Sequence, residues 1–559
     1  NGGGTFPDFG ASESDMVPSD LTGPNISYGL IPAGVVAANR TLTGFATITD
    51  NSGVNVTPGT RPRVYYKKST DANAFVGNTS GDNGWKWVEA SNASSPFNFT
   101  IDYTIINGGS IAVADVIQYF VVAQDLAPAA TVSSNPNVGF TGTSVAAISS
   151  APTTPNSYTI GASFPSVVYL GTGAGVPNYS SFSGAAGLFN AINTSVVASD
   201  VTVIVQNNTV EDGTVSLNEF TKGYRIFVVP GAAVTFTFEG TTAAANDALL
   251  ELNGADDFLI DGRFGGSGKY LRFVNNNVTA SGTGPILRFI NDSRRSGIGY
   301  CTLESNATVS TNPIIMFGAT TGNYGNDSLL VDSCLFKNST GTNPGSYFTA
   351  IGSTGTSTGI QKNSSIAIIN NNFTGWLANS TVVIDFSALS MGDSLIVDSN
   401  RVYNNITMTA AWTAIKLTGN GNNCTANFNS IGGSNPDRSG SPIFANTGIT
   451  MTAIDIKSGN TIKSDVHGNI IANISNMAPA TLTSGITKGI NIQGGRINIG
   501  TLVGNTIGGK ANVWDTVTSA YDNGWIDIVT ASATDTILVW NNTISYANYW
   551  RKRNDRNAG

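Results

Sequence analysis

One short pattern recurs through the second half of the chain: an apolar strand, a small polar corner and a second apolar strand. It is plainest at 328–336, 365–373 and 394–402. Successive corners, indexed two residues before the second apolar run, lie 33, 37, 29, 29, 40, 36 and 37 residues apart. This period predicts a solenoid with variable loops. The corner residues are Cys301, Cys334, Asn371, Asn400, Asn429, Asn469, Asn505 and Asn542.

Within each copy the apolar residues alternate or run for four or five positions, and β-branched residues dominate, which indicates strands. Asparagine suits the corner because it tolerates left-handed backbone geometry and bonds to nearby backbone groups. Stacked coils would hold these amides about 4.8 Å apart, each able to donate to the next. Cys301 and Cys334 are expected in the same inward column as small buried hydrophobes. We therefore predict a right-handed parallel β-helix, the hand being that of parallel crossovers.

The first part of the chain has a different, antiparallel pattern. The strand 42–49 alternates cleanly, Asp50–Gly53 supplies a turn, and 63–68 resumes the alternation. Short strands with a turn every ten or so residues predict a β-sandwich of immunoglobulin or fibronectin type III kind. The absence of a cysteine pair favours the latter. The whole chain is thus predicted to be all-β.

The domain boundaries follow from these patterns. A helix predicted at 183–193 would cap the first coil and cover its exposed strand edges. A stretch rich in Ser, Pro and Thr before it predicts a linker. The predicted order is a lead-in at 1–20, the sandwich at 21–148, the linker at 149–160, the capping segment at 161–200, the β-helix at 201–550 and the start of a linker or tail at 551–559.

Composition excludes several classes of function. Only 11% of the 559 residues are charged, and the net charge of −8 argues against nucleic acid or an anionic membrane as partner. Three cysteines without a Cys-x-x-Cys pair argue against a disulfide framework and structural zinc. The single histidine, His467, is a low count for an enzyme that needs general acids and bases. No apolar run reaches the roughly 18 residues of a membrane span.

A family resemblance rests on three stretches and their order. Val-Thr-Val-Ile-Val at 201–205 and Phe-Thr-Phe-Glu-Gly at 236–240 precede Leu-Glu-Leu-Asn-Gly-Ala-Asp-Asp-Phe-Leu-Ile-Asp-Gly-Arg at 250–263. The chain in this respect resembles large secreted β-helix proteins of Bacteroidota. The module with Thr-Asp-Asn-Ser-Gly at 49–53 and Tyr-Phe-Val-Val-Ala-Gln-Asp at 119–125 resembles the sandwich modules that accompany them.

The resemblance carries expectations about location and partners. It implies export through the type IX secretion system and display on the exterior of the outer membrane, or release from it. Secretion and surface-attachment machinery would then be partners. The C-terminal sorting domain of that system is not visible in this sequence, so the export route rests on resemblance alone.

The densest charged cluster is Asp256, Asp257, Asp261 and Arg263, with Glu251 before it. As an enzyme site it would pair two carboxylates across a sugar, or bind Ca²⁺ and use arginine as base, as polysaccharide lyases of this fold do. The alternative, which we favour, is that the acids occupy turns flanking a strand. The Asn-Thr-Asp, Gly-His-Gly and Arg-Ile-Lys signatures of galacturonases are absent. We predict no metal or other cofactor, with Ca²⁺ as the exception to consider.

Two further groups are candidate ligand-binding residues. Arg288, Arg294 and Arg295 form a local basic patch that would clamp a carboxylated polysaccharide by bidentate contacts, although a solvated corner loop is the preferred interpretation. Trp525 and Trp540 lie in an aromatic-rich stretch near the end of the chain. Their rings would stack on the faces of polysaccharides or surface glycans, or else close the bottom of the solenoid. His467 lies in a repeated corner, which favours a structural role.

A modification signal accompanies the repeat. Asp-Ser/Thr followed by an aliphatic residue resembles the O-glycosylation site of Bacteroidota, and a corner would expose the hydroxyl. The candidate residues are Ser328, Ser394, Thr516 and Thr536.

Three functional hypotheses follow. The preferred one is a non-enzymatic extracellular or cell-surface protein, an adhesin or stalk in which a sandwich leads into a rigid β-helix. The second is a β-helix carbohydrate-active enzyme, either a polysaccharide lyase or a glycoside hydrolase. The third is a phage or viral fibre. A β-helix used for display should resist proteases, so rapid trypsin cleavage within 200–550 would contradict the preferred hypothesis.

Overall fold

The chain divides into two compact units, Asn1–Ser163 and Phe164–Gly559. The predicted lead-in, apart from residue 20, and the predicted tail lie outside the described residues. None of the described helices is long and apolar enough to cross a membrane. The computed structural model describes residues 20–241, 248–276, 284–305, 312–320, 322–339, 347, 349–445, 449–476, 487–508, 515–517, 524–529, 534–545 and 547–549.

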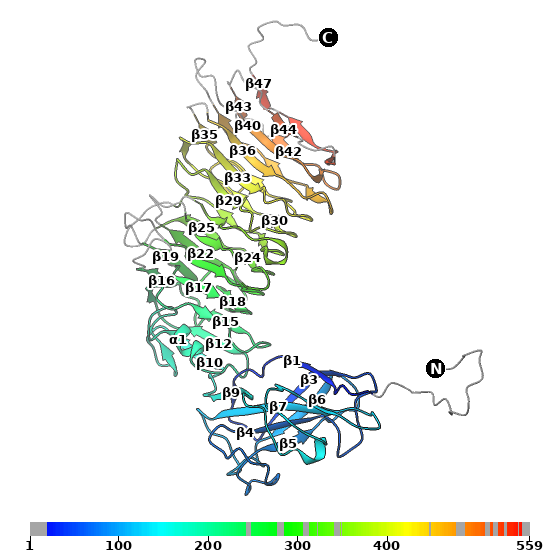
Figure 1. Ribbon diagram of the computed structural model, residues 1–559. Helices are drawn as coiled ribbons and strands as arrows, with labels where there is room; N and C mark the ends of the chain where they lie inside the picture. Colours follow the sequence, from blue (N-terminus) through cyan, green and yellow to red (C-terminus); the bar gives the residue numbers. More distant parts are fainter. Residues whose placement is uncertain are drawn as a thin grey trace, which may run out of the picture. The chain divides into compact units, whose positions relative to one another are not determined.

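The first unit consists of two sheets whose strands pair mainly in antiparallel fashion (Figure 1). The smaller sheet has the order β1-β3-β6, with β1 (Asn25–Tyr28), β3 (Asn39–Thr49) and β6 (Phe97–Asp102). The larger has the order β2-β9-β7-β4-β5, and β8 also pairs with β7. Its strands are β2 (Gly34–Val35), β4 (Arg63–Lys68), β5 (Lys86–Glu89), β7 (Val116–Gln124), β8 (Val132–Asn135) and β9 (Asn156–Gly161).

The two sheets face each other across one apolar core. Ile48 and Phe99 from the smaller sheet share a buried cluster with Val64 and Val121 from the larger one. On the opposite face of the larger sheet, Tyr65 belongs to a second cluster beside the short helix η1 (Val145–Ala147). Neighbouring residues of a strand thus alternate between the two clusters, as expected for a sheet that is packed on both faces. The unit is a β-sandwich, and its assignment to the immunoglobulin or fibronectin type III kind stays a prediction.

The segment predicted as a linker, 149–160, contains most of β9. This strand pairs with β7 in register from Val116↔Thr159 to Tyr119↔Asn156. Tyr158 and Ile160 are buried because they alternate toward the core of the sandwich. The linker prediction rested on the Ser, Pro and Thr content of 149–155, which directly precedes this alternating strand. The first unit therefore extends to residue 163.

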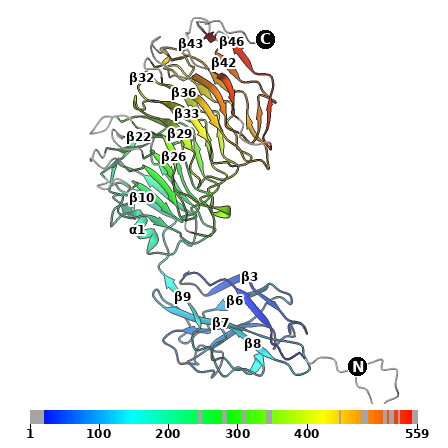
Figure 2. The ribbon, with the colours of Figure 1, turned by 45° about the horizontal axis from the view of Figure 1, so that its top comes forward.

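The second unit is a parallel β-helix, as predicted (Figures 1 and 2). Every strand pair that its sheets contain is parallel, and each strand pairs with the equivalent strand one coil away. The right hand of the coil stays a prediction from the crossover rule. The first long sheet has β11 (Asn178–Tyr179), β10 (Val167–Leu170), β12 (Val201–Val205), β15 (Ile226–Pro230), β18 (Phe258–Asp261), β21 (Gly297–Gly299), β24 (Leu330–Asp332), β27 (Ala367–Ile369) and β30 (Ile396–Asp398), followed after isolated bridges at Thr425 by β37 (Ser464–Val466), β41 (Arg496–Ile499) and β45 (Thr536–Val539).

Two further long sheets and a shorter one complete each coil. The second long sheet has β13 (Thr209–Glu211), β16 (Phe236–Gly240), β19 (Leu271–Asn275), β22 (Cys301–Ser305), β25 (Leu335–Asn338), β28 (Asn372–Phe373), β31 (Arg401–Val402), β34 (Ser430–Ile431), β38 (Ile470–Ile471), β42 (Thr506–Gly508) and β46 (Thr543–Ser545). The third has β14 (Leu217–Asn218), β17 (Leu250–Asn253), β20 (Leu287–Ile290), β23 (Ile315–Phe317), β26 (Ile351–Ser353), β29 (Val382–Phe386), β33 (Trp412–Leu417), β36 (Met451–Ile456), β40 (Thr487–Ile492) and β44 (Gly524–Ile528). The shorter sheet has β32 (Thr407–Met408), β35 (Ile443–Ala445), β39 (Ile474–Asn476), β43 (Asp515–Val517) and β47 (Ala547–Tyr549).

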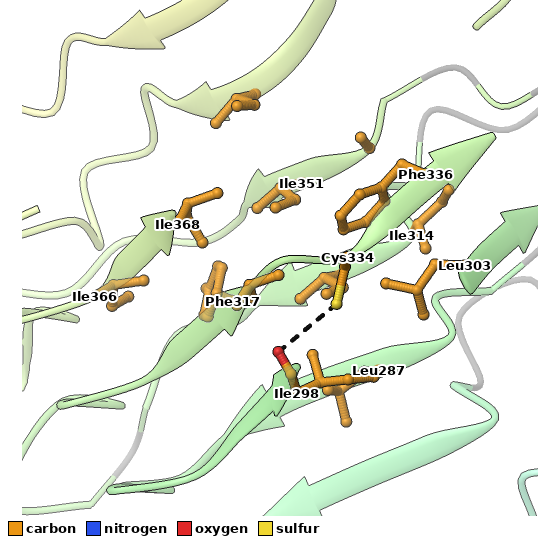
Figure 3. Packing of buried hydrophobic residues seen from close by; sticks show 14 of the residues in the cluster. Leu287, Ile298, Leu303, Ile314, Phe317, Cys334, Phe336, Ile351, Ile366 and Ile368 are labelled. Carbon is orange, nitrogen blue, oxygen red and sulfur yellow. Dashed lines mark hydrogen bonds between the residues drawn. The ribbon is translucent and has the colours of Figure 1, made fainter. Parts of the chain in front are cut away.

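One continuous apolar core runs through the coils. Inward side chains stack on like side chains of the next coil: the rings of Phe238 and Phe273 lie 4.4 Å apart and those of Phe336 and Phe373 lie 4.7 Å apart. Figure 3 shows Phe336 and Leu303 among these inward residues, with the Cys334 thiol donating to the carbonyl of Ile298. Stacking of this kind allows the core to grow with length, which a single compact core cannot do.

The solenoid begins earlier than predicted. Strand β10 already pairs in parallel with β12, so the stack starts at residue 167 rather than 201. Helix α1 (Leu188–Asn193) is shorter than the predicted 183–193. The residues just before it form turns instead, because buried Glu211 accepts hydrogen bonds from the backbone N–H groups of Phe182 and Ser183. The helix buries Leu188, Phe189 and Ile192 against the first coils.

Candidate functional site

The corner asparagines form one buried column. From Asn371 to Asn542 each side-chain amide donates to the Oδ1 atom of the next, at 3.1, 3.2, 3.0, 2.8 and 2.8 Å. The backbone N–H of each asparagine donates to the same Oδ1 atom, as Asn400 does to Asn429 at 3.0 Å. The column is extended by buried Cys334, whose N–H donates to Asn371, and by buried Cys301 one coil before it. These residues link successive coils, and all but the partly exposed Asn542 are buried.

The residue just before a ladder position adopts a left-handed conformation at every ladder position except Asn505, which follows Gly504. Its φ is 54° at Tyr300, 54° at Ser333, 59° at Asn370, 61° at Ser399 and 56° at Phe428. Serine and asparagine are common in such a conformation, but a bulky side chain there is a strained exception. Strain of this kind gathers at functional sites. Two bulky residues occupy this position, Tyr300 and Phe428. The Tyr300 ring lies against the Arg263 guanidinium, and Phe428 requires a separate explanation.

Phe428 lies in a surface groove along this corner. The ring is 54% exposed and rests against the next corner, where a Cβ at Gly468 would lie 2.5 Å from the Cδ1 atom of Phe428. The groove is lined by Asn370, Ser399, Arg401, Phe428, Asn429, Ser430, Pro436, Asp437, Arg438 and Ile470. Three of these, Arg401, Ser430 and Ile470, are successive outward residues of the second long sheet.

The opposite wall of the groove is a loop that follows β34. This loop belongs to the longest repeat, the 40-residue step from Asn429 to Asn469. It is fixed by its own hydrogen bonds, including Arg438 N–H to the Asn435 carbonyl at 2.8 Å and Ser439 N–H to Asp437 Oδ1 at 2.9 Å. The amide of Asn473 also donates to the carbonyl of Arg438 at 3.1 Å. The wall is thus built into the structure.

Two arginines line the groove and differ in their exposure and hydrogen bonding. Arg401 is exposed, and its guanidinium has no hydrogen-bond or ion-pair partner among the described residues. Arg438 donates from Nη1 to the Ser430 hydroxyl at 2.5 Å, whereas its Nε is buried without a partner. Burial lowers the pKa of Arg438, and the charge of Arg401 lowers it further, against the opposing effect of Asp437. The groove therefore presents the unpartnered donors of Arg401 beside the charge of Arg438.

Sequence analysis did not identify this groove. Two signals were present: phenylalanine at a corner position that the neighbouring coils fill with Ser, Asn or Gly, and the longest spacing in the repeat. Neither signal indicates by itself that Arg401 and Arg438 line the same groove, because this depends on the path of the loop that carries Arg438.

The predicted catalytic acids are held in ion pairs between coils. Asp256 and Asp257 are buried, and Arg295 contacts both, at 2.9 and 2.8 Å. The N–H of Arg294 donates to Asp256 at 2.8 Å. Burial raises the pKa of Asp256, and Arg295 opposes that shift. The structure thus joins two groups that the sequence had presented separately, one as catalytic and the other as ligand-binding.

The remaining charged candidates are also paired. Asp261 lies at the far end of β18 from Asp257 and accepts from Arg263 at 2.6 Å. The Arg263 guanidinium lies 4.0 Å from the ring centre of Tyr300. Arg288 forms an ion pair with Glu251 of the preceding coil. The charges are therefore arranged as links between coils or within a corner.

The aromatic and histidine candidates lie apart from these groups. Trp525 is partly buried and packs against the solenoid core, whereas Trp540 is 68% exposed. His467 is buried, with Nε2 3.2 Å from Asp465 Oδ1. The other aromatics of this stretch, Tyr521, Tyr546, Trp550 and the side chain of Tyr549, lie outside the described residues.

The candidate glycosylation residues differ in exposure. Ser328 and Thr536 are exposed, and Ser394 is partly exposed, its hydroxyl accepting from Asn423 at 3.1 Å. The side chain of Thr516 lies outside the described residues.

Three carboxylates of the first unit offer oxygens to a metal. Asp20, Asp50 and Asp125 place one oxygen each within 4.8 Å of the others. Carboxylate oxygens are ligands that suit Ca²⁺. By contrast, Asp256, Asp257 and Asp261 are paired with arginines, which leaves them poorly suited to hold a cation.

Comparison with known proteins shows only a weak similarity to solved structures. No family model matches the chain, and no curated protein matches it. Solved structures with some similarity include a family 28 exopolygalacturonase of Yersinia enterocolitica, 9% identical, with a TM-score of 0.25, covering 93% of this chain and 98% of that one. The Agl-KA catalytic domain is 10% identical, with a TM-score of 0.23, covering 95% of this chain and 100% of that one. Overlap this low carries no argument about activity, so function must be argued from the residues of this chain.

Proposed function

We propose that this chain is a non-enzymatic, adhesin-like extracellular protein that binds glycans on the side of a rigid β-helix. The observation that supports this best is the groove at Phe428. An exposed ring beside hydroxyl, amide and guanidinium groups is a combination that suits a sugar, since the ring covers the apolar face and the polar groups bond to the substituents.

The state of the carboxylates also supports binding without catalysis. A glycoside hydrolase uses two carboxyl groups across the scissile bond. The groove is lined by one carboxylate, that of Asp437. Asp256, Asp257 and Asp261, which the sequence had suggested for such a pair, are bound to arginines. Asp256 and Asp257 link neighbouring coils through Arg295, and Asp261 pairs with Arg263 within one corner.

The proposal includes a location. Export through the type IX secretion system and attachment at the exterior of the outer membrane accord with the resemblance of the repeat stretches to secreted Bacteroidota proteins. O-linked sugars at Ser328, Ser394, Thr516 and Thr536 would accompany export. Their detection by mass spectrometry of the protein from its native host tests this part of the proposal.

A polysaccharide lyase is a second candidate, favoured by one observation. Lyases of β-helix fold use arginine as a base, and the pKa of Arg438 is lowered by burial and by Arg401. A base of lowered pKa is better matched to proton abstraction near neutral pH. Such a reaction would leave an unsaturated sugar at the new chain end.

One experiment separates the two candidates. The full chain is applied to an array of acidic and neutral polysaccharides, and retention is measured together with new reducing or unsaturated ends. We expect retention without new ends. New ends that disappear in Arg438→Lys would establish the lyase, whereas no retention on any glycan would contradict both candidates.

A further inference from the structure

We propose that the groove of Arg401, Phe428 and Arg438 selects acidic saccharides, with the sugar ring on Phe428 and its anionic group on the arginines. The inference rests on the proposed glycan binding and specifies its ligand class. It depends on four features of the groove: an aromatic platform, free cationic donors, neutral polar groups and a fixed wall.

The aromatic platform is held in place at a conformational cost. Phe428 has a φ of 56°, and the same corner position is occupied by Asn370, Ser399 and Gly468 in neighbouring coils. A left-handed conformation costs an ordinary L-residue roughly 1–2 kcal/mol. The ring nevertheless remains 54% exposed, so burial offsets only part of this cost. The exposed face is accessible to the apolar face of a sugar ring.

The cationic donors distinguish an acidic ligand from a neutral one. Two guanidinium groups and one carboxylate line the groove, which leaves an excess of positive charge there. Arg401 has no hydrogen-bond or ion-pair partner among the described residues, so its donors are open to a ligand, whereas the Nε atom of Arg438 is buried and that residue contributes charge. Arginine binds carboxylate and related oxyanions through paired, charge-assisted hydrogen bonds. An anionic sugar substituent would satisfy the donors of Arg401 and be attracted by the charge of Arg438, which a hydroxyl would do only in part.

The remaining lining residues fit a saccharide rather than an isolated anion. The amide oxygen of Asn370 and the hydroxyl of Ser399 are offered along the same corner, whereas the Ser430 hydroxyl accepts from Arg438. They lie on successive coils, about 4.8 Å apart per coil, so contacts extend along the solenoid. A small anion would engage the arginines alone.

The wall of the groove is preorganised. The hydroxyl of Ser430 links Arg438 back to the second long sheet at 2.5 Å, and Asn473 holds the loop carbonyls of Arg438 and Gly440 at 3.1 and 2.9 Å. A binding site that is already ordered loses less conformational entropy when the ligand binds.

The overall charge of −8 does not prevent binding of an anion. At physiological ionic strength charges beyond about 8 Å are largely screened. The local excess of positive charge at the groove therefore determines whether an anion binds there. Binding should weaken as salt is raised, because the arginines act through charge.

The test measures binding of the full chain to matched oligosaccharides by calorimetry. The ligands are a uronic acid oligomer, its methyl ester, which has the same rings without charge, and a sulfated dextran oligomer. We expect the uronic acid oligomer or the sulfated oligomer to bind at least tenfold more tightly than the methyl ester. Which of the two binds identifies carboxylate or sulfate as the recognised group.

Variants place the binding in the groove. Arg401→Ala should weaken binding about tenfold or more, which corresponds to about 1.4 kcal/mol, and Arg401→Lys should restore part of the loss because the charge returns without the paired donors. Phe428→Asn should weaken binding of charged and methylated oligomers alike. Arg225→Ala removes the same charge at an exposed site on the early coils and should leave binding unchanged. Thermal unfolding of each variant checks that it is folded.

Several results would overturn the inference. Equal binding of acid and methyl ester, or an Arg401→Ala variant that binds like the parent, would contradict it while leaving glycan binding as a function intact. Binding to no glycan would contradict the proposed function as well.

Discussion

At the scale of single residues, Phe428 illustrates a conflict between stability and function. Its corner position is filled by Ser399 one coil before and by Gly468 one coil later, and all three have positive φ. Asparagine, which occupies the position at Asn370, adopts this conformation at lower cost. Retention of phenylalanine there is understandable if the exposed ring binds a ligand.

Phe428→Asn should therefore maintain or raise stability while it lowers glycan binding. The relief of a left-handed phenylalanine is worth about 1 kcal/mol, and the loss of a half-exposed ring offsets part of it. Urea unfolding and calorimetry on the same preparation provide both measurements. A variant that is destabilised by more than about 2 kcal/mol would show that the ring serves mainly to pack the corner.

A second residue-scale prediction concerns pH. Burial raises the pKa of Asp256 above its value in the unfolded chain, about 3.9. The folded state therefore holds this proton to higher pH than the unfolded state does. The contribution of the group to stability is complete below about pH 4 and is lost as pH rises through the folded pKa.

Asp256→Asn removes this titration. The variant should lose less stability than the parent chain as pH rises from about 4 toward neutrality, as measured by thermal unfolding across that range. Asp212→Asn, at an exposed position near the start of the solenoid, serves as the control. Identical pH slopes for the parent and Asp256→Asn would show that Arg295 compensates fully for burial.

At the scale of elements, the asparagine column acts as a strand-like ladder made of side chains. Asn429 is fully buried, and its side chain takes part in four hydrogen bonds: Oδ1 accepts two from Asn400, and the amide donates to the Val397 carbonyl and to Asn469. Truncation leaves buried donors and acceptors of the neighbouring coils without partners, each costing about 1–3 kcal/mol.

Asn429→Ala should accordingly destabilise the solenoid by about 3 kcal/mol or more, seen as a lower midpoint of urea unfolding. Asn218→Ala is the matched control, since Asn218 is exposed and accepts one hydrogen bond from partly exposed Asn253. We expect a change below about 0.5 kcal/mol for the control. Similar effects of the two substitutions would mean that the ladder adds little to the pairing of backbones.

The elements also show how far the sequence could predict this structure. The column of Asn371 to Asn542 was predictable because one residue type recurs at one position of a strand pattern. The pairing of Asp257 with Arg295 was not, because coil lengths vary and the partners are 38 residues apart. Strand β9 was missed because its two buried residues, Tyr158 and Ile160, follow a stretch of linker-like composition. The groove depended on the path of the loop around Arg438, which only tertiary hydrogen bonds define.

At the scale of the whole molecule, the chain has separate cores. The buried clusters of the first unit contain residues up to Tyr158 and Ile160, and the solenoid cluster begins at Phe164. No described sheet contains strands of both units. Each unit therefore buries its own apolar surface, which is the physical requirement for independent folding.

We expect the two units to unfold as separate transitions. The pieces 1–163 and 164–559, expressed singly, should each show the strand signal in circular dichroism, and calorimetry of the full chain should give transitions that match those of the pieces. The piece 164–559 should also retain all binding of acidic saccharides, because every lining residue of the groove belongs to it. If instead 1–163 is unfolded alone, or if removing it abolishes binding, the sandwich takes part in the stability or function of the β-helix, and display of a self-sufficient binding solenoid would no longer describe this molecule.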